Sequence, residues 1–173
     1  MNQLQRSALH ELQHFFIDRI EVALHALKNI PFSHIYDFGC GEALLPTVLG
    51  FPSDRYTGYD KTPFHPWVHT LDLETPNLPD MKSGPQDVCL FLGVFEHISY
   101  RKTVFLWAVQ QFPIMLFTWG KNPEDLKALY QGIETDFELT VFPYFRSDKT
   151  YCEVCRLTRR GKPSSWLTDN AKT

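Results

Sequence analysis

One short stretch constrains this chain more than any other, the run Ile35-Tyr36-Asp37-Phe38-Gly39-Cys40-Gly41-Glu42. It predicts a strand over 35–38 that ends in an acid, then a glycine turn and a helix over 43–49. Gly39 and Gly41 carry no Cβ, so the backbone can turn sharply there and come close to a ligand. The start of the following helix adds free N–H groups. A strand, turn and helix in this order make a hollow of nucleotide size, although a plain β–α turn has the same local pattern.

The spacing of the glycines separates two families of ligand. The dinucleotide fingerprint Gly-x-Gly-x-x-Gly fits poorly, because its third glycine would fall at Leu44. The run from Asp37 to Glu42 resembles instead the first motif, acid-x-Gly-x-Gly-x-Gly, of class I S-adenosylmethionine (SAM) methyltransferases, with Ala43 in place of the last glycine. The resemblance implies that Gly39 and Gly41 touch the amino-acid moiety of SAM and that Asp37 orients its ammonium group.

Two further acids follow at the ends of predicted strands. Asp60 ends a strand predicted over 55–60 and lies 23 positions after Asp37, close to the spacing of about 20 at which such an acid meets a ribose. A carboxylate accepts hydrogen bonds from both ribose hydroxyls. Nicotinamide and SAM enzymes share this device, so Asp60 indicates an adenosine ligand without separating the two. For Asp72, in a strand-like piece over 68–73, the resemblance implies contact with the adenine amino group; a solvated loop acid is the alternative.

The unbroken apolar run within 87–98 predicts a central parallel strand that is buried on both faces. It ends in Phe95-Glu96-His97-Ile98, at the strand end where ligands sit in open α/β sheets. The segment resembles the fourth motif of SAM methyltransferases, and its tail is similar to that of the ubiquinone-pathway O-methyltransferases. Glu96 and His97 are therefore the candidate catalytic acid and base. Alternatively, Glu96 caps the next helix and His97 packs beneath the cofactor.

No metal site is predicted. Small-RNA 2′-O-methyltransferases hold a metal with Glu-x-x-Glu-His, and Gly93 stands here at the position of the first glutamate. Cys152-x-x-Cys155 lies in a predicted strand, where positions three apart point to opposite faces. A second pair of ligands is also missing.

The remaining patterns complete one α/β domain. An amphipathic helix over 2–28 is predicted to pack on it, as an N-terminal unit of residues 1–30. In the family that the chain resembles, such a helix often helps to close the cofactor site. The SAM-binding domain is predicted over 31–158 and a polar tail over 159–173. Its further elements are a helix over 99–112, a strand over 113–118, a helix over 123–133, and strands over 137–142 and 150–157. The resemblance implies a single Rossmann-like, doubly wound domain with a seven-stranded, mostly parallel sheet and an antiparallel terminal hairpin.

Composition limits the function. A chain of 173 residues suits one domain, and its net charge of −3 argues against a dedicated nucleic-acid binder, although a local basic groove stays open. Arg159, Arg160 and Lys162 make a small basic tail that could touch phosphate, with a solvated chain end as the alternative. The sequence shows neither a signal peptide nor an apolar run long enough to span a bilayer, and its four cysteines form no secreted framework. We therefore expect reduced thiols and a cytoplasmic protein.

These features predict a SAM-dependent methyltransferase whose cofactor is SAM. Its acceptor, a small molecule or an exposed group of RNA or protein, is expected to enter over Glu96, His97, Phe64–Trp67 and the loop 119–122. Two alternatives stay open. One is a non-catalytic scaffold with the same fold, and the other is a nicotinamide-dependent oxidoreductase.

Overall fold

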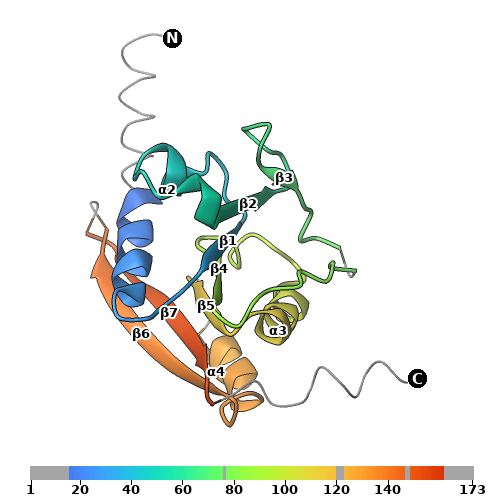
Figure 1. Ribbon diagram of the computed structural model, residues 1–173. Coiled ribbons are helices and arrows are strands. Elements are labelled where there is room, and N and C mark those ends of the chain that lie inside the picture. Colours follow the sequence, from blue (N-terminus) through green and yellow to red (C-terminus); the bar gives the residue numbers. More distant parts are fainter. Residues whose placement is uncertain (1–15, 76, 120–122, 147–148, 162–173) are drawn as a thin grey trace.

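The computed structural model describes residues 16–75, 77–119, 123–146 and 149–161, and its centre is one seven-stranded sheet (Figure 1). The strand order is β3-β2-β1-β4-β5-β7-β6. The first five are parallel, and β7 pairs antiparallel with both β5 and β6. Their bounds are β1 His34–Phe38, β2 Tyr56–Asp60, β3 His69–Thr70, β4 Asp87–Phe91, β5 Ile114–Phe117, β6 Phe137–Phe145 and β7 Tyr151–Arg159. The predicted fold, including the terminal hairpin, is confirmed.

The order in which strands are added to the sheet reverses between β1 and β4. From β1 the chain builds β2 and β3 on one side, then crosses back to build β4 and β5 on the other. Asp37 consequently has Gly58 on one neighbouring strand and Leu90 on the other. In open α/β sheets a ligand lies outside the carboxyl ends of the strands at such a switch point. The glycine turn after β1 lies at that place.

Alternating side chains of the central strands build a core on each face of the sheet. Val88 and Leu90 of β4 point to one core, and Cys89 and Phe91 point to the other. The helix over 16–27 and the short α2 (Leu44–Thr47) cover the first face. The second face is covered by α3 (Arg101–Gln111) and α4 (Pro123–Gln131). Both faces of β4 are thus buried, as the continuous apolar run predicts.

Several predicted elements are shorter in the structure. The helix predicted over 43–49 is the single turn α2, because Ala43 has left-handed backbone angles (φ 50°, ψ 53°) and Gly50 (φ 68°) follows soon after. The strand predicted over 68–73 has only two residues in β3, which lies at the edge of the sheet and, among the described strands, pairs with β2 alone. The apolar run from 87 stops being a strand at Phe91, and Gly93 turns the chain with a φ of 74°.

The two ends of the described chain are tied to the sheet. Within residues 16–27 the buried side chains Ile20, Ala23 and Leu27 recur at helical spacing, as predicted; residues 1–15 lie outside the described part. At the other end, β7 extends to Arg159, whose guanidinium donates to the carbonyl of Val109 at 2.6 Å. Arg160 donates to the carbonyl of Phe137 at 3.1 Å.

Longer elements also occur where the sheet edge permits them. β6 continues three residues past its predicted end at 142 and includes Pro143. An edge strand tolerates a proline, because one side of the strand needs no ladder hydrogen bond.

Among the described residues, no helix combines the length and the apolar character that crossing a bilayer requires.

Candidate ligand-binding site

The glycine turn after β1 is docked on the end of β2. The N–H groups of Gly39 and Cys40 both donate to the carbonyl of Tyr59, at 2.7 and 3.1 Å. Gly39 (φ 68°) and Gly41 (φ 54°) both have left-handed backbone, which favours glycine. A Cβ at position 39 would lie 2.7 Å from Cγ2 of Val94, whereas a Cβ at position 41 would meet no atom within 4 Å. The first glycine thus allows close packing on the β4 loop, and the second leaves bare backbone beside open space.

That open space is a cavity of about 290 Å³. The turn contributes Asp37, Gly39 and Gly41 to its wall, and the helix over 16–27 contributes Phe16 and Arg19. Three of the five predicted cofactor-binding residues therefore line one cavity. Asp60, Asp72, Glu96 and His97 are not among its lining residues.

Asp37 is a buried acid in the cavity wall, with 8% of its surface exposed. The Tyr56 hydroxyl donates to its Oδ2 at 2.9 Å. Burial raises the pKa of Asp37 to about 7, and the hydrogen bond from Tyr56 and the positive charge of Arg19 offset only part of this rise. Burial and the charge of Asp37 also raise the pKa of the neighbouring Cys40 thiol, to about 12. The surroundings of Asp37 thus stabilise its ionised form less well than water does.

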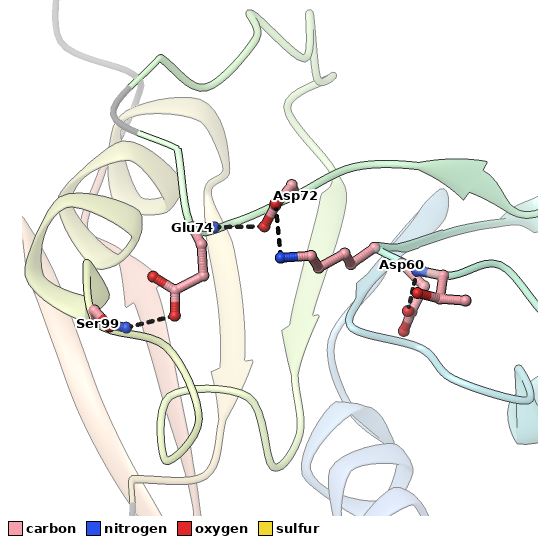
Figure 2. Close-up of polar contacts among 6 residues, drawn as sticks. Asp60, Asp72, Glu74 and Ser99 are labelled. Carbon is pink, nitrogen blue, oxygen red and sulfur yellow. Dashed lines mark hydrogen bonds and ion pairs between the residues drawn. The ribbon is translucent and has the colours of Figure 1, made fainter.

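Asp60 connects the end of β2 to the glycine turn. Its Oδ2 accepts the N–H of Gly41 at 2.9 Å. Its Oδ1 accepts the N–H of Thr62 at 2.9 Å (Figure 2). A carboxylate has about four lone-pair sites, so two backbone donors leave room for further hydroxyl donors. Asp60 is half-buried, and it lies next to the cavity through its bond to Gly41.

Asp72 follows β3 and belongs to a separate hydrogen-bond and ion-pair network (Figure 2). It accepts the N–H of Glu74 at 2.9 Å and forms an ion pair with Nζ of Lys61 at 2.9 Å. Both interactions lower its pKa, the backbone hydrogen bond most. Glu74 in turn accepts the N–H of Ser99 at 2.8 Å, so the network ties the ends of β2 and β3 to the segment after β4.

Glu96 and His97 lie after β4 and are both exposed. The hydroxyl of Thr118 donates to Oε1 of Glu96 at 3.1 Å. The alternative that Glu96 caps the next helix is wrong, because Tyr100 is the N-cap of α3. The backbone N–H of His97 donates to the carbonyl of Val94 at 2.9 Å and closes a turn.

Arg19 is a site residue that the sequence patterns did not identify. A Cβ at Gly93 would lie 2.6 Å from Cζ of Arg19, so the guanidinium packs directly on the bare backbone of this glycine. It also lies over the Phe16 ring, 4.4 Å from the centroid. Burial lowers the pKa of Arg19, although the charges of Tyr144, Glu96 and Asp37 counteract this. A signal existed, because position 19 lies three residues after Phe16 and four before Ala23, on the apolar face of the predicted amphipathic helix.

The segment predicted on the substrate side bends over the glycine turn. Nε2 of His65 is 3.2 Å from the carbonyl oxygen of Glu42, and its ring stacks on Trp67 with centroids 5.1 Å apart. Phe64 lines the cavity although 64% of its surface is exposed. Trp119 instead packs against Phe95, with centroids 5.2 Å apart, and residues 120–122 of its loop lie outside the described chain.

The four cysteines are all free, and Cys152 and Cys155 lie on β7 as predicted. Cys155 is buried and Cys152 is half-buried. Among the described residues, no three His, Cys, Asp or Glu side chains come together in a way that could hold a metal ion.

Comparison with known sequences finds nothing: no protein-family model matches the chain, and no curated protein matches it. Comparison with solved structures finds proteins with a similar fold. The structure of magnesium protoporphyrin IX methyltransferase from Synechocystis with bound SAM has a TM-score of 0.58 at 14% identity, over 92% of this chain and 85% of that one.

Two other solved structures give the same result. The methyltransferase domain of a bacterial CtHen1 has a TM-score of 0.56 at 13% identity, over 81% of this chain and 97% of that domain. The human methyltransferase 10 domain containing protein has a TM-score of 0.57 at 11% identity, over 82% and 79%. The chain thus has the fold of these methyltransferases. At this level of identity the likeness concerns the fold alone.

Proposed function

We propose that this protein is a SAM-dependent methyltransferase that transfers a methyl group to an acceptor at the carboxyl ends of β4 and β5. The observation that carries the proposal is the cavity beside Gly41. There, bare backbone, the buried acid Asp37 and the half-buried cation Arg19 converge at the switch point of a methyltransferase-like sheet.

The charges of the cavity match the amino-acid end of SAM, which carries both an ammonium and a carboxylate. Asp37 would hold the ammonium, and Arg19 would hold the carboxylate. Gly41 would let this end approach the backbone, since no side chain intervenes. The ribose would bind the free lone pairs of Asp60, and Asp72 would face the adenine. Asp37, Arg19, Gly41 and Asp60 therefore suit the amino-acid end and the ribose of the cofactor that the sequence resemblance implies, whereas Asp72 already pairs with Lys61.

The chemistry asks the protein mainly for alignment. SAM supplies the methyl group on a positively charged sulfur that leaves readily. The protein must hold the acceptor in line with that group and exclude water, and such positioning alone lowers a barrier by several kcal/mol. A base is needed only when the acceptor carries a proton. Glu96 and His97, just beyond the end of β4, are our candidates for that role.

The alternatives differ in what they bind. A scaffold without a working site predicts no heat of binding with SAM, and a nicotinamide enzyme predicts a thermal shift with NAD(H) instead. Isothermal titration and thermal-shift measurements with SAM, S-adenosylhomocysteine and NAD(H) therefore test the proposal. Absence of SAM binding would contradict it.

Asp60→Ala is the sharpest substitution for this test. We expect SAM affinity to fall at least about tenfold, because charge-assisted hydrogen bonds to the ribose and the anchor of Gly41 are lost together. Asp60→Asn retains an oxygen for Gly41 and should have a smaller effect. Asp54→Ala, at an exposed acid in the 3-10 turn Ser53–Arg55, is the matched control and should bind as the wild type does. Unchanged affinity in Asp60→Ala would remove this residue from the site.

The acceptor remains open between a small molecule and an exposed group of RNA or protein. The neighbours include a porphyrin methyltransferase, so the shared fold does not select a class of acceptor. The kinship with the ubiquinone-pathway O-methyltransferases rests only on Phe95-Glu96-His97-Ile98. A cytoplasmic location rests only on the sequence.

A further inference from the structure

Thr118 is a buried hydroxyl that joins the carboxyl ends of two neighbouring strands. It follows β5 directly, and only 7% of its surface is exposed. Its Oγ1 accepts the N–H of Gly93 at 2.7 Å and donates to Oε1 of Glu96 at 3.1 Å. A hydroxyl has one proton to give. Since the N–H of Gly93 occupies a lone pair, the proton is directed at Glu96, and the exposed carboxylate has a defined orientation.

This chain of hydrogen bonds begins directly beneath the wall of the cavity. Arg19 lines the cavity and packs on Gly93, the residue whose N–H orients Thr118. Leu92, one residue earlier, lines the cavity as well. The carboxylate of Glu96 is therefore connected to the proposed SAM site through Gly93 and Thr118, although it does not itself line the cavity.

We infer that Thr118 is a positioning residue that aims the Glu96 carboxylate at the acceptor atom, and that the acceptor is a proton-bearing group, a hydroxyl or an amine. The inference rests on the proposed methyltransferase function. A fixed carboxylate serves an acceptor that must lose a proton during transfer. An anionic carboxylate acceptor has no proton to lose and would be repelled by Glu96.

The atoms balance in one step. A lone pair of the acceptor oxygen or nitrogen forms the new bond to the methyl carbon, while the electron pair of the sulfur–methyl bond returns to sulfur. The sulfonium thereby becomes a neutral thioether. The proton of the acceptor passes to the carboxylate of Glu96 and from there, because Glu96 is exposed, to water.

The first test examines the product and requires no knowledge of the acceptor. The wild-type protein is incubated with SAM that carries a tritiated methyl group and with cell extract separated into protein, RNA and small-molecule fractions. The labelled product is then treated with mild alkali. Ethers and methylated amines keep the label, whereas methyl esters release it as volatile methanol. Label that stays in the product supports the inference, and label released as methanol overturns it.

The second test separates positioning from structure. Thr118→Val removes the hydroxyl and keeps the shape, and we expect transfer to fall at least about tenfold. The dissociation constant of SAM should change less than about threefold, because Gly93 and Glu96, to which Thr118 is hydrogen-bonded, are not among the residues proposed to hold SAM. Thr118→Ser retains the hydroxyl and should recover most of the transfer.

Thr158→Val is the matched control. Its Oγ1 is buried without a hydrogen-bond partner among the described residues, and it lies beside Ile114 at the opposite end of β5. This variant should transfer as the wild type does. A folded Thr118→Val protein with an unchanged rate of transfer overturns the inference. If that variant does not fold, a Thr118→Ser protein with a wild-type melting temperature but at least about tenfold slower transfer overturns it instead.

Results that contradict the proposed methyltransferase function differ from those that contradict only the inference about Thr118 and the acceptor. If the wild type binds no SAM, both proposals fall. If it binds SAM and transfers the label to none of the fractions, the scaffold alternative is favoured and the inference is overturned. If it transfers the label as a methyl ester, only the inference fails.

Discussion

Asp37→Asn should stabilise the free protein, and more strongly at pH 8 than at pH 5. Burial raises the pKa of Asp37 from 3.8 to about 7. In the unfolded chain the carboxyl ionises at its ordinary pKa, so between pH 4 and 7 the folded state binds more protons than the unfolded state. The contribution of Asp37 to stability is therefore greatest below pH 4 and is lost as pH rises toward 7. The asparagine cannot ionise and escapes this loss, and its side-chain oxygen can still accept the hydroxyl of Tyr56.

The size of the effect follows from the two pKa values. One pKa unit corresponds to about 1.4 kcal/mol, so a difference of about three gives about 4 kcal/mol once both states are ionised. At pH 5 the same relation gives a smaller destabilisation of the wild type, about 2 kcal/mol. In a chain of this length each kcal/mol shifts Tm by roughly 2–4 °C. The gap in Tm between variant and wild type should therefore widen by roughly 4–8 °C from pH 5 to pH 8.

Urea denaturation at the two pH values measures the free energy of unfolding directly. Taking the difference between two variants at each pH cancels the titration of groups that they share. Asp54→Asn, at an exposed carboxyl, should give the same difference from the wild type at both pH values. If the gap for Asp37→Asn does not change with pH, then ionisation of Asp37 costs the folded state nothing, and the account of the cavity as an unfavourable place for its charge is wrong.

Three further predictions test the site. Gly41→Ala and Gly50→Ala both place a methyl group on left-handed backbone with no atom within 4 Å, so each should cost about 1–2 kcal/mol of stability; only Gly41→Ala should lose SAM binding in calorimetry, and equal affinities would show that the backbone at 41 does not face the ligand. Arg19→Gln should weaken SAM binding about tenfold through loss of a charged hydrogen bond, whereas Arg101→Gln on α3 should not; equal effects would indicate a loss of general charge. His97→Ala should lower turnover in a labelled-methyl assay more than it lowers SAM affinity, and an equal loss of both would indicate packing instead of proton transfer.

The sequence by itself determined the local parts of the site. Glycines before a short helix, an acid at a strand end, and an apolar run without polar alternation are patterns of neighbouring residues, and each reflects a local conformational or burial requirement. That is why the sequence could propose Gly39, Gly41 and Asp60 as site residues. It is also why β4 could be predicted as buried on both faces. The ends of elements do not follow from local patterns alone, because the length of a strand such as β3 also depends on how many of its residues pair with the neighbouring strand.

Only the tertiary structure decided which side chains meet. Arg19 reaches Gly93 from a helix far earlier in the chain, and Thr118 reaches Glu96 from the next strand. Asp72, which the pattern offered to a ligand, already pairs with Lys61. Such contacts depend on strand order and on side-chain rotamers, and the residues next to each position along the chain specify neither. The sequence therefore indicated a ligand and an edge of the sheet, whereas only the folded chain placed Arg19 and Asp37 in the wall of one cavity and the hydroxyl of Thr118 on the Glu96 carboxylate.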